Sequence, residues 1–186
     1  VAEALRADGV QLLTGHQAVR CERAGDTKRL IVKQGDTEHT IEFDELLCAV
    51  GRSPRVEGFG LEELGIPITK KKTVETDAYL QTLYPNIYAV GDVAGPYQLT
   101  HVAAHQAWYA AVNALFGRFK RFKADYSVIP WATFTDPEVA RVGLSETEAK
   151  EQGIEVEVTR YGIDDLDRAI ADGTAHGFVK VLTVPG

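Results

Sequence analysis

A short apolar run that ends in glycine and aspartate is the feature that most constrains this chain. Residues 87–90 have the composition of a strand, and Gly91 and Asp92 follow at once. In open α/β sheets, ligands bind beyond the carboxyl ends of strands, and a glycine there lets a ligand approach the backbone closely. An aspartate at that point accepts hydrogen bonds from sugar-like hydroxyl groups. The pattern favours a site for a nucleotide-type cofactor, and an aspartate that only caps a turn is the alternative.

A long helix pattern follows this aspartate. Residues 100–116 place small apolar side chains at the spacing of a helix face, and Gly117 ends the pattern. Those side chains are Val102, Ala103, Ala107, Ala110, Ala111, Ala114 and Leu115. The many alanines predict close packing against another element. The free N–H groups at the start of such a helix favour a negatively charged ligand.

The first fifty residues predict a small sheet and a separate buried strand. Residues 19–23, 29–33 and 39–43 are short strand patterns joined by turns, which predicts an antiparallel meander. Residues 45–50 form a continuous apolar run, typical of a buried strand with Cys48 in the core. Further short strands are expected at 10–13, 76–81 and 87–90. Gly51 starts a turn directly after the 45–50 run. This glycine either lets a cofactor approach the backbone or simply marks the end of the strand.

The last third of the sequence predicts a second structured region. Residues 117–127 are polar and basic with interleaved aromatics, which indicates a linker. Strands are expected at 131–134, 139–142, 156–161 and 177–182, and a helix at 164–171. Another helix is expected to begin after Ser145, because Ser145 and Glu148 have the spacing of a capping box.

Composition excludes several classes of function. The chain of 186 residues has 27 acidic and 20 basic side chains, a net charge of −7, which disfavours nonspecific binding to nucleic acid or an anionic membrane. No apolar run approaches the length of a membrane-spanning helix. Cys21 and Cys48 lack the spacing of a zinc site or a redox pair, and we expect reduced thiols in a cytoplasmic protein. His101 and His105 have helical spacing without the glutamate of HExxH, so no metal site is expected. The chain contains no Met and starts within a pattern, so we interpret it as a fragment of a longer protein.

Several motifs occur here in the order found in one enzyme family. They are the GRxP stretch at 50–54, a Thr-Asp pair at 76–77 leading to 87–92, residues 134–138 leading to 142–144, and the stretches 168–169 and 177–180. In this order and spacing the chain resembles the class I pyridine nucleotide–disulfide oxidoreductases, and most of all their dihydrolipoamide dehydrogenase-like and mercuric reductase-like members. The resemblance covers nearly the whole chain.

The resemblance implies a mixed α/β (α+β) fold. Residues 1–53 would be the C-terminal part of an NAD(P)-binding domain, 54–124 the C-terminal part of an FAD-binding domain, and 125–186 the start of an α+β dimerisation domain. The implied cofactors are FAD and NAD(P)H. The implied cofactor-binding residues are Gly51 for the nicotinamide dinucleotide, Gly91 and Asp92 for the ribityl or phosphate part of FAD, and Gln98, Leu99, Thr100 and His101 along the flavin.

The family's sulfur chemistry is missing from these residues. Neither GxGxxG motif is present, nor the CxxxxC redox pair, so no catalytic residue is expected here. The implied parent enzyme is a homodimer in the cytoplasm. It passes electrons between NAD(P)H and a small-molecule or thiol substrate, which is a disulfide, a dithiol or a metal-thiolate. The fragment alone is expected to be inactive. Two alternatives stay open, a noncatalytic FAD- or nucleotide-binding module and a flavin oxidoreductase that uses no disulfide.

Overall fold

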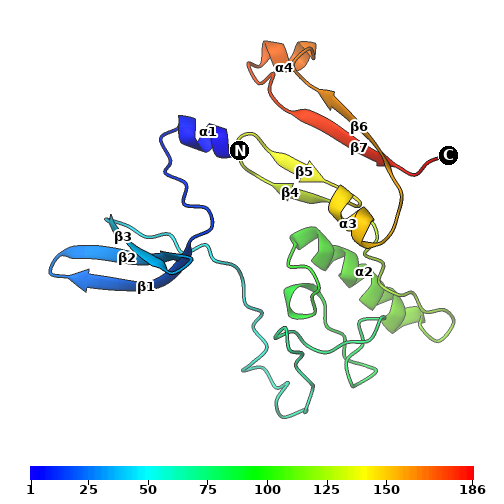
Figure 1. The fold of residues 1–186 in the computed structure, drawn as a ribbon. Helices are drawn as coiled ribbons and strands as arrows, with labels where there is room; N and C mark the ends of the chain where they lie inside the picture. The colour runs from blue at the N-terminus through cyan, green and yellow to red at the C-terminus, as the bar shows by residue number, and fades with distance from the viewer. The chain divides into compact units, whose positions relative to one another are not determined.

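The computed structural model describes every residue from Val1 to Gly186, in two compact units. One unit consists of residues 17–126, and the other combines residues 1–16 with 127–186. Both contain helices and strands, which confirms the mixed α/β fold class (Figure 1). The domain boundaries expected after residues 53 and 124 stay predictions.

The 17–126 unit begins with a three-stranded antiparallel meander. Its strands are β1 (Gln17–Ala24), β2 (Thr27–Gln34) and β3 (Thr37–Phe43), in the order β1-β2-β3. Two-residue turns between paired strand ends set this register, with Ala24 opposite Thr27 and Gln34 opposite Thr37. The predicted meander is confirmed.

The buried strand expected at residues 45–50 is absent. These residues form no strand, Val50 is 87% exposed, and Cys48 is exposed rather than part of a core. A strand is held by hydrogen bonds to its neighbours, and no other strand of this chain pairs with these residues. The expected strands at 10–13, 76–81 and 87–90 are wrong as well. Only isolated bridges form in this part of the chain, between Ile68 and Val74 and between Gln81 and Tyr88.

Turns and one helix make up the rest of this unit. A small core of Val56, Ile66, Val74 and Ala89 lies beneath irregular chain. The short 3-10 turn η1 (Gly91–Val93) leads to helix α2 (Thr100–Phe116), whose bounds agree with the prediction from sequence.

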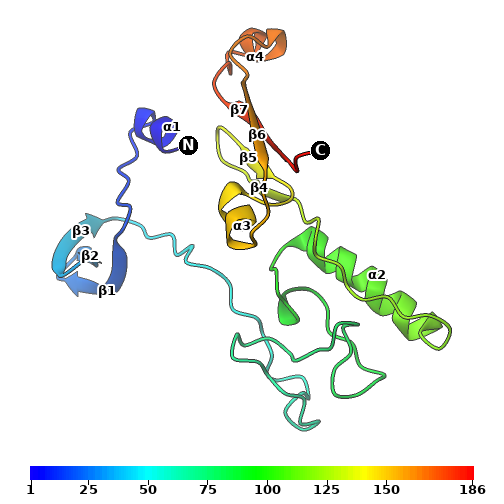
Figure 2. The ribbon, with the colours of Figure 1, turned by 45° about the vertical axis from the view of Figure 1, so that its right-hand side comes forward.

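The chain after α2 turns back along the helix, as both views of the ribbon show (Figures 1 and 2). We call residues 117–126 the return segment. The Asn113 side chain accepts a hydrogen bond from the N–H of Phe122 at 2.8 Å and donates to its carbonyl at 2.8 Å. His105 Nε2 lies 2.6 Å from the carbonyl oxygen of Asp125. The segment is therefore packed on α2 rather than a plain linker, because the polar side chains of Asn113 and His105 bind its backbone.

The other unit is built from hairpins and short helices. It contains helix α1 (Ala2–Ala7), the hairpin β4 (Trp131–Thr133) and β5 (Val139–Arg141), and helix α3 (Glu146–Glu151). Strands β6 (Glu157–Gly162) and β7 (Phe178–Thr183) then pair antiparallel, with helix α4 (Asp167–Ala171) between them in sequence. Each of the four expected strands is present, and the capping box of Ser145 and Glu148 is formed. None of the helices has both the length and the apolar character that a membrane span requires.

Candidate functional site

Gly91 begins a tight turn that places Asp92 beside α2. We call residues 91–95 the Gly91 turn. Gly91 is buried with φ +74°, a conformation that glycine adopts without the strain of a side chain. A Cβ at this position would lie 3.1 Å from the Cβ of Ala103 in the first turn of α2. The close approach of turn and helix therefore requires glycine here.

Hydrogen bonds between backbone groups of residues 91–95 stabilise the turn. The Gly91 carbonyl accepts hydrogen bonds from the N–H groups of Ala94 at 2.9 Å and Gly95 at 3.1 Å. This arrangement uses the Gly91 oxygen twice and leaves the Gly91 N–H and the Gly95 carbonyl for other partners. It also fixes the backbone of Asp92, whose side chain is half-buried and forms no salt bridge.

A single glutamine of α2 supplies both remaining partners. The Gln106 side chain is fully buried. Its Oε1 accepts from the Gly91 N–H at 2.5 Å, and its Nε2 donates to the Gly95 carbonyl at 2.5 Å and to the Tyr126 hydroxyl at 2.8 Å. Burial raises the pKa of the Tyr126 phenol, so this hydroxyl stays neutral at physiological pH.

The start of α2 completes this region. Leu99 precedes the first turn and gives it no side-chain cap, and no acidic residue lies in that turn. Leu99 therefore offers no side-chain acceptor to the N–H groups of the first turn. Gln98 and Leu99 are half-buried, whereas Thr100 and His101 are exposed. The predicted residues from Gly91 to His101 thus lie on the Gly91 turn and the start of the helix that contacts it. Gly91 is buried and the others are at least partly exposed, and we call this set the candidate surface.

Gly51 stands apart from that surface. It is exposed with φ +124°, and a Cβ there would meet nothing within 4 Å. Its neighbour Arg52 does reach the site, because Arg52 Nη1 donates to the carbonyl oxygen of Gln98 at 3.3 Å. The structure therefore joins the two motifs through Arg52 rather than through Gly51.

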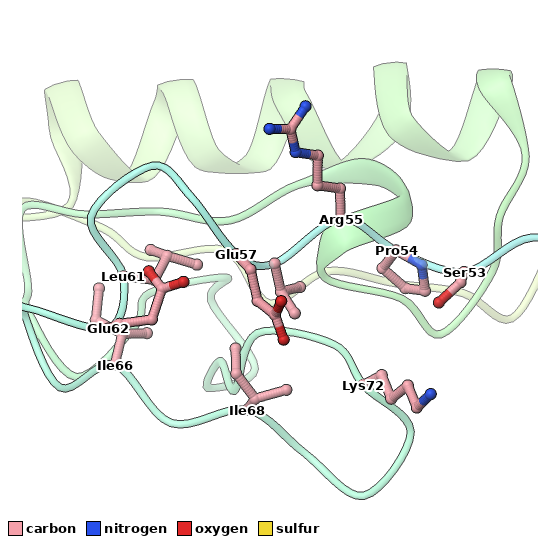
Figure 3. Close-up of a pocket in the computed structure, with 10 residues that line it drawn as sticks. Ser53, Pro54, Arg55, Glu57, Leu61, Glu62, Ile66, Ile68 and Lys72 are labelled. Atoms are coloured by element: carbon pink, nitrogen blue, oxygen red, sulfur yellow. The ribbon is translucent and has the colours of Figure 1, made fainter.

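A cavity of about 590 Å³ lies elsewhere in the same unit. Figure 3 shows residues that line it, among them Pro54, Leu61, Ile66 and Ile68 with charged side chains around them. The Glu62 carboxylate is held by backbone N–H groups, including that of Gly58 at 2.9 Å, which lowers its pKa. No residue expected to bind a cofactor lines this cavity.

Gln106 and Tyr126 are the site residues that the sequence reasoning missed. One signal was present for the glutamine. Val102, Gln106 and Asn113 are the buried residues of α2, so two amides lie on a helix face that is otherwise apolar. A buried amide must find hydrogen-bond partners, and a polar residue on an apolar face indicates that another segment supplies them.

These residues fit a flavin nucleotide. A tight glycine turn fixes the backbone of Asp92, a half-buried carboxylate accepts from hydroxyl groups, and a helix start without a side-chain cap offers N–H groups to an electron-rich edge. The three features lie between Gly91 and His101, on one turn and the start of one helix. Phosphate, ribityl hydroxyls and an isoalloxazine edge are groups of that chemistry.

Comparison with known proteins identifies the family. The sequence profile described as pyridine nucleotide-disulphide oxidoreductase matches residues 1–107, and that of the same family's dimerisation domain matches residues 129–186. The dihydrolipoyl dehydrogenase of Chlamydia muridarum is 38% identical over 94% of this chain and 36% of its own length. The mercuric reductase of Staphylococcus aureus is 37% identical over 98% of this chain and 33% of its own length.

Solved structures agree with these relatives. LpdA from Mycobacterium tuberculosis has a TM-score of 0.86 with 27% identity, over 99% of this chain and 39% of that one. The HOCl-induced flavoprotein disulfide reductase RclA from Escherichia coli has a TM-score of 0.82 with 27% identity, over 98% of this chain and 41% of that one. The chain thus spans about two fifths or less of the proteins it matches. The chain belongs to the pyridine nucleotide-disulphide oxidoreductase family, which uses FAD and NAD(P)H, and the resemblance stated from its motifs is confirmed.

Proposed function

We propose that this chain forms part of the FAD site of an NAD(P)H-dependent flavoprotein disulfide reductase. The whole enzyme passes electrons between NAD(P)H and a disulfide, dithiol or metal-thiolate substrate. When bound, FAD supplies the redox chemistry, and the protein sets its position and electrostatic surroundings. Family membership over residues 1–107 and 129–186 supports this function over a noncatalytic module or a flavin enzyme without a disulfide.

The Gly91 turn is the single observation that carries the proposal. It holds the half-buried Asp92 next to the uncapped start of α2. In this proposal the Asp92 carboxylate accepts hydrogen bonds from hydroxyl groups of the cofactor. The backbone N–H groups at Thr100 and His101 favour negative charge on the edge of the ring that they face. In this proposal Gly51 contacts the nicotinamide dinucleotide.

We assign no proton or electron transfer to a side chain of this chain. Cys21 and Cys48 are free and exposed thiols, Cys21 on strand β1 and Cys48 in the irregular segment after β3. Their spacing is not that of a redox pair. We therefore expect the 186-residue chain on its own to show no NAD(P)H-dependent disulfide reduction. Free thiols also suit the cytoplasmic location that we include in the proposal.

We further propose that the whole protein is a homodimer that pairs through residues 129–186. The match to a dimerisation domain supports this arrangement. Large apolar side chains are also exposed on the hairpins of this unit, among them Phe134, Val142 and Phe178. Apolar side chains gathered on a surface often mark an interface.

The experiment removes the Asp92 carboxylate in the full-length protein. Asp92→Ala takes away a hydrogen-bond acceptor at a partly desolvated site, which costs about 1–3 kcal/mol and weakens FAD binding roughly 5- to 150-fold. The measurement is the Kd of FAD for the apoprotein, followed by quenching of flavin fluorescence. Asp36→Ala is the matched control, because Asp36 is an exposed aspartate in the turn between β2 and β3. Wild-type FAD affinity in Asp92→Ala would exclude the proposed site.

A further inference from the structure

We propose that Gln106 is a positioning residue of the flavin site, because its buried amide fixes the Gly91 turn that presents Asp92 to FAD. This inference rests on the proposed function and assigns a role to a residue that touches no cofactor itself. It follows from three hydrogen bonds of one side chain that is fully shielded from solvent.

The amide spans the two ends of the turn. Its oxygen binds the N–H of Gly91 and its nitrogen binds the carbonyl of Gly95, each at 2.5 Å. Both backbone groups are in buried residues, and neither is used by the hydrogen bonds inside the turn. The carboxamide satisfies both at once because it carries a donor and an acceptor on one planar group. Without it, a buried donor and a buried acceptor would lose their partners and the turn would relax.

The orientation of the amide follows from these partners. The Gly91 N–H can only donate, so it must face Oε1. The Gly95 carbonyl can only accept, so it must face Nε2. The second N–H of Nε2 goes to the Tyr126 hydroxyl at 2.8 Å. Tyr126 is in turn enclosed by edge contacts with Tyr97 at 5.9 Å and His105 at 6.4 Å between ring centres. The return segment thereby holds the glutamine in the orientation that the turn requires.

The same helix carries a matched control. Asn113 is also a buried amide, and it makes hydrogen bonds to the backbone of Phe122 and to the Tyr79 carbonyl. It has the same chemistry and comparable burial, but no bond to residues 91–95. Substitutions at Asn113 therefore measure how much stability is lost with a buried amide of α2, without an effect on the Gly91 turn.

The test compares both amides in the full-length protein. Gln106→Leu and Asn113→Leu remove the hydrogen bonds, and both are expected to lower the thermal midpoint. Only Gln106→Leu is expected to weaken FAD binding to the apoprotein at least tenfold and to shift the visible absorption and midpoint potential of the bound flavin. Asn113→Leu is expected to keep the wild-type Kd, spectrum and potential.

A pH titration gives a second and independent readout. In Gln106→Glu, the neutral acid keeps one acceptor for Gly91 and one donor for Gly95, whereas the ionised carboxylate has no donor. FAD affinity of Gln106→Glu is therefore expected to approach wild type at low pH and to fall as the pH rises and the acid ionises. The wild type and Asn113→Asp are expected to lack this dependence.

The outcomes separate the inference from the proposed function. A folded Gln106→Leu protein with wild-type Kd, spectrum and potential overturns the role of Gln106. If that variant does not fold, a Gln106→Glu protein whose FAD affinity matches that of the wild type at every pH overturns it instead. Weak FAD binding in Asp92→Ala together with unaffected Gln106 variants leaves the proposed function standing, whereas full FAD binding in Asp92→Ala removes the proposed function itself.

Discussion

The same three residues, Ala-Val-Gly, occur twice in this chain with opposite outcomes. At 49–51 they are exposed, and nothing lies near the glycine. At 89–91 the alanine is buried in a core, and the glycine packs against Ala103 of α2. Both glycines have a positive φ, so local backbone preference does not distinguish them. The difference arises from what another segment brings to the turn, which for Gly91 is a small side chain and a buried amide.

The largest expected effect comes from giving Gly91 a side chain. Gly91→Ala forces an L-residue to φ +74° and places its Cβ 3.1 Å from that of Ala103, so we expect a loss of about 1–3 kcal/mol in the free energy of unfolding. Urea denaturation of the 186-residue chain, followed by circular dichroism, measures this loss.

A second substitution separates the two causes of that loss. Ala103→Gly removes the atom that Gly91→Ala would meet, so the double variant should be more stable than the sum of the two single effects predicts. Strict additivity would show that backbone strain alone matters at Gly91. An unchanged urea midpoint in Gly91→Ala would contradict the packing of this turn altogether.

The turn before α3 extends the comparison, because the residues that bind Glu148 there are all close to it in sequence. Glu148 accepts from the Ser145 N–H at 2.8 Å and from the Arg141 guanidinium at 2.8 and 2.9 Å. The Arg141 hydrogen bonds, with those of Ser145, lower the Glu148 pKa from 4.5 to about 2. Because the pKa is lowered on folding, this contribution to stability is complete above about pH 4.5 and is lost as the pH falls toward 2.

Carboxyl-carbon NMR measures this titration directly. The Glu148 signal should titrate near pH 2, and in Arg141→Gln its midpoint should move up toward the ordinary range of a glutamate. A wild-type Glu148 that titrates near 4.5 would show that the bidentate contact with Arg141 does not persist in solution.

The smallest effect is expected at Gly51. Gly51→Ala disfavours φ +124°, but the surrounding backbone is exposed and free of packing, so it can adopt another conformation. We expect a change below about 0.5 kcal/mol in the unfolding free energy of the 186-residue chain, measured by the same urea denaturation. A loss as large as that of Gly91→Ala would mean that the two glycines do not differ as the structure indicates.

Features with partners nearby in sequence were predictable. The bounds of α2 follow from its alanine spacing and from Gly117, and the capping box follows from Ser145 and Glu148. The β1-β2-β3 meander follows from alternating patterns joined by short turns. In each of these, the residues that form the element also contain the signal for it.

Features that depend on remote partners were not predictable. Residues 45–50 have the composition of a buried strand, but composition does not reveal whether a neighbouring strand is present to pair with them. Gln106 was missed because its role appears only when residues 91, 95 and 126 meet around it. The candidate surface from Gly91 to His101 was predicted as a set of residues, and whether these residues bind the cofactor stays a prediction.

The return segment has a consequence for how this region tolerates insertions and deletions. Loops between elements usually accept changes in length, because few of their backbone groups have fixed partners. Here Phe122 binds Asn113 near the end of α2, whereas Asp125 and Tyr126 bind His105 and Gln106 nearer its start. One residue gained or lost between Phe122 and Asp125 would change the spacing between these bound residues, and a shift of Tyr126 would reach Gln106. Length variation between Phe122 and Tyr126 is therefore incompatible with the Gly91 turn as the structure has it.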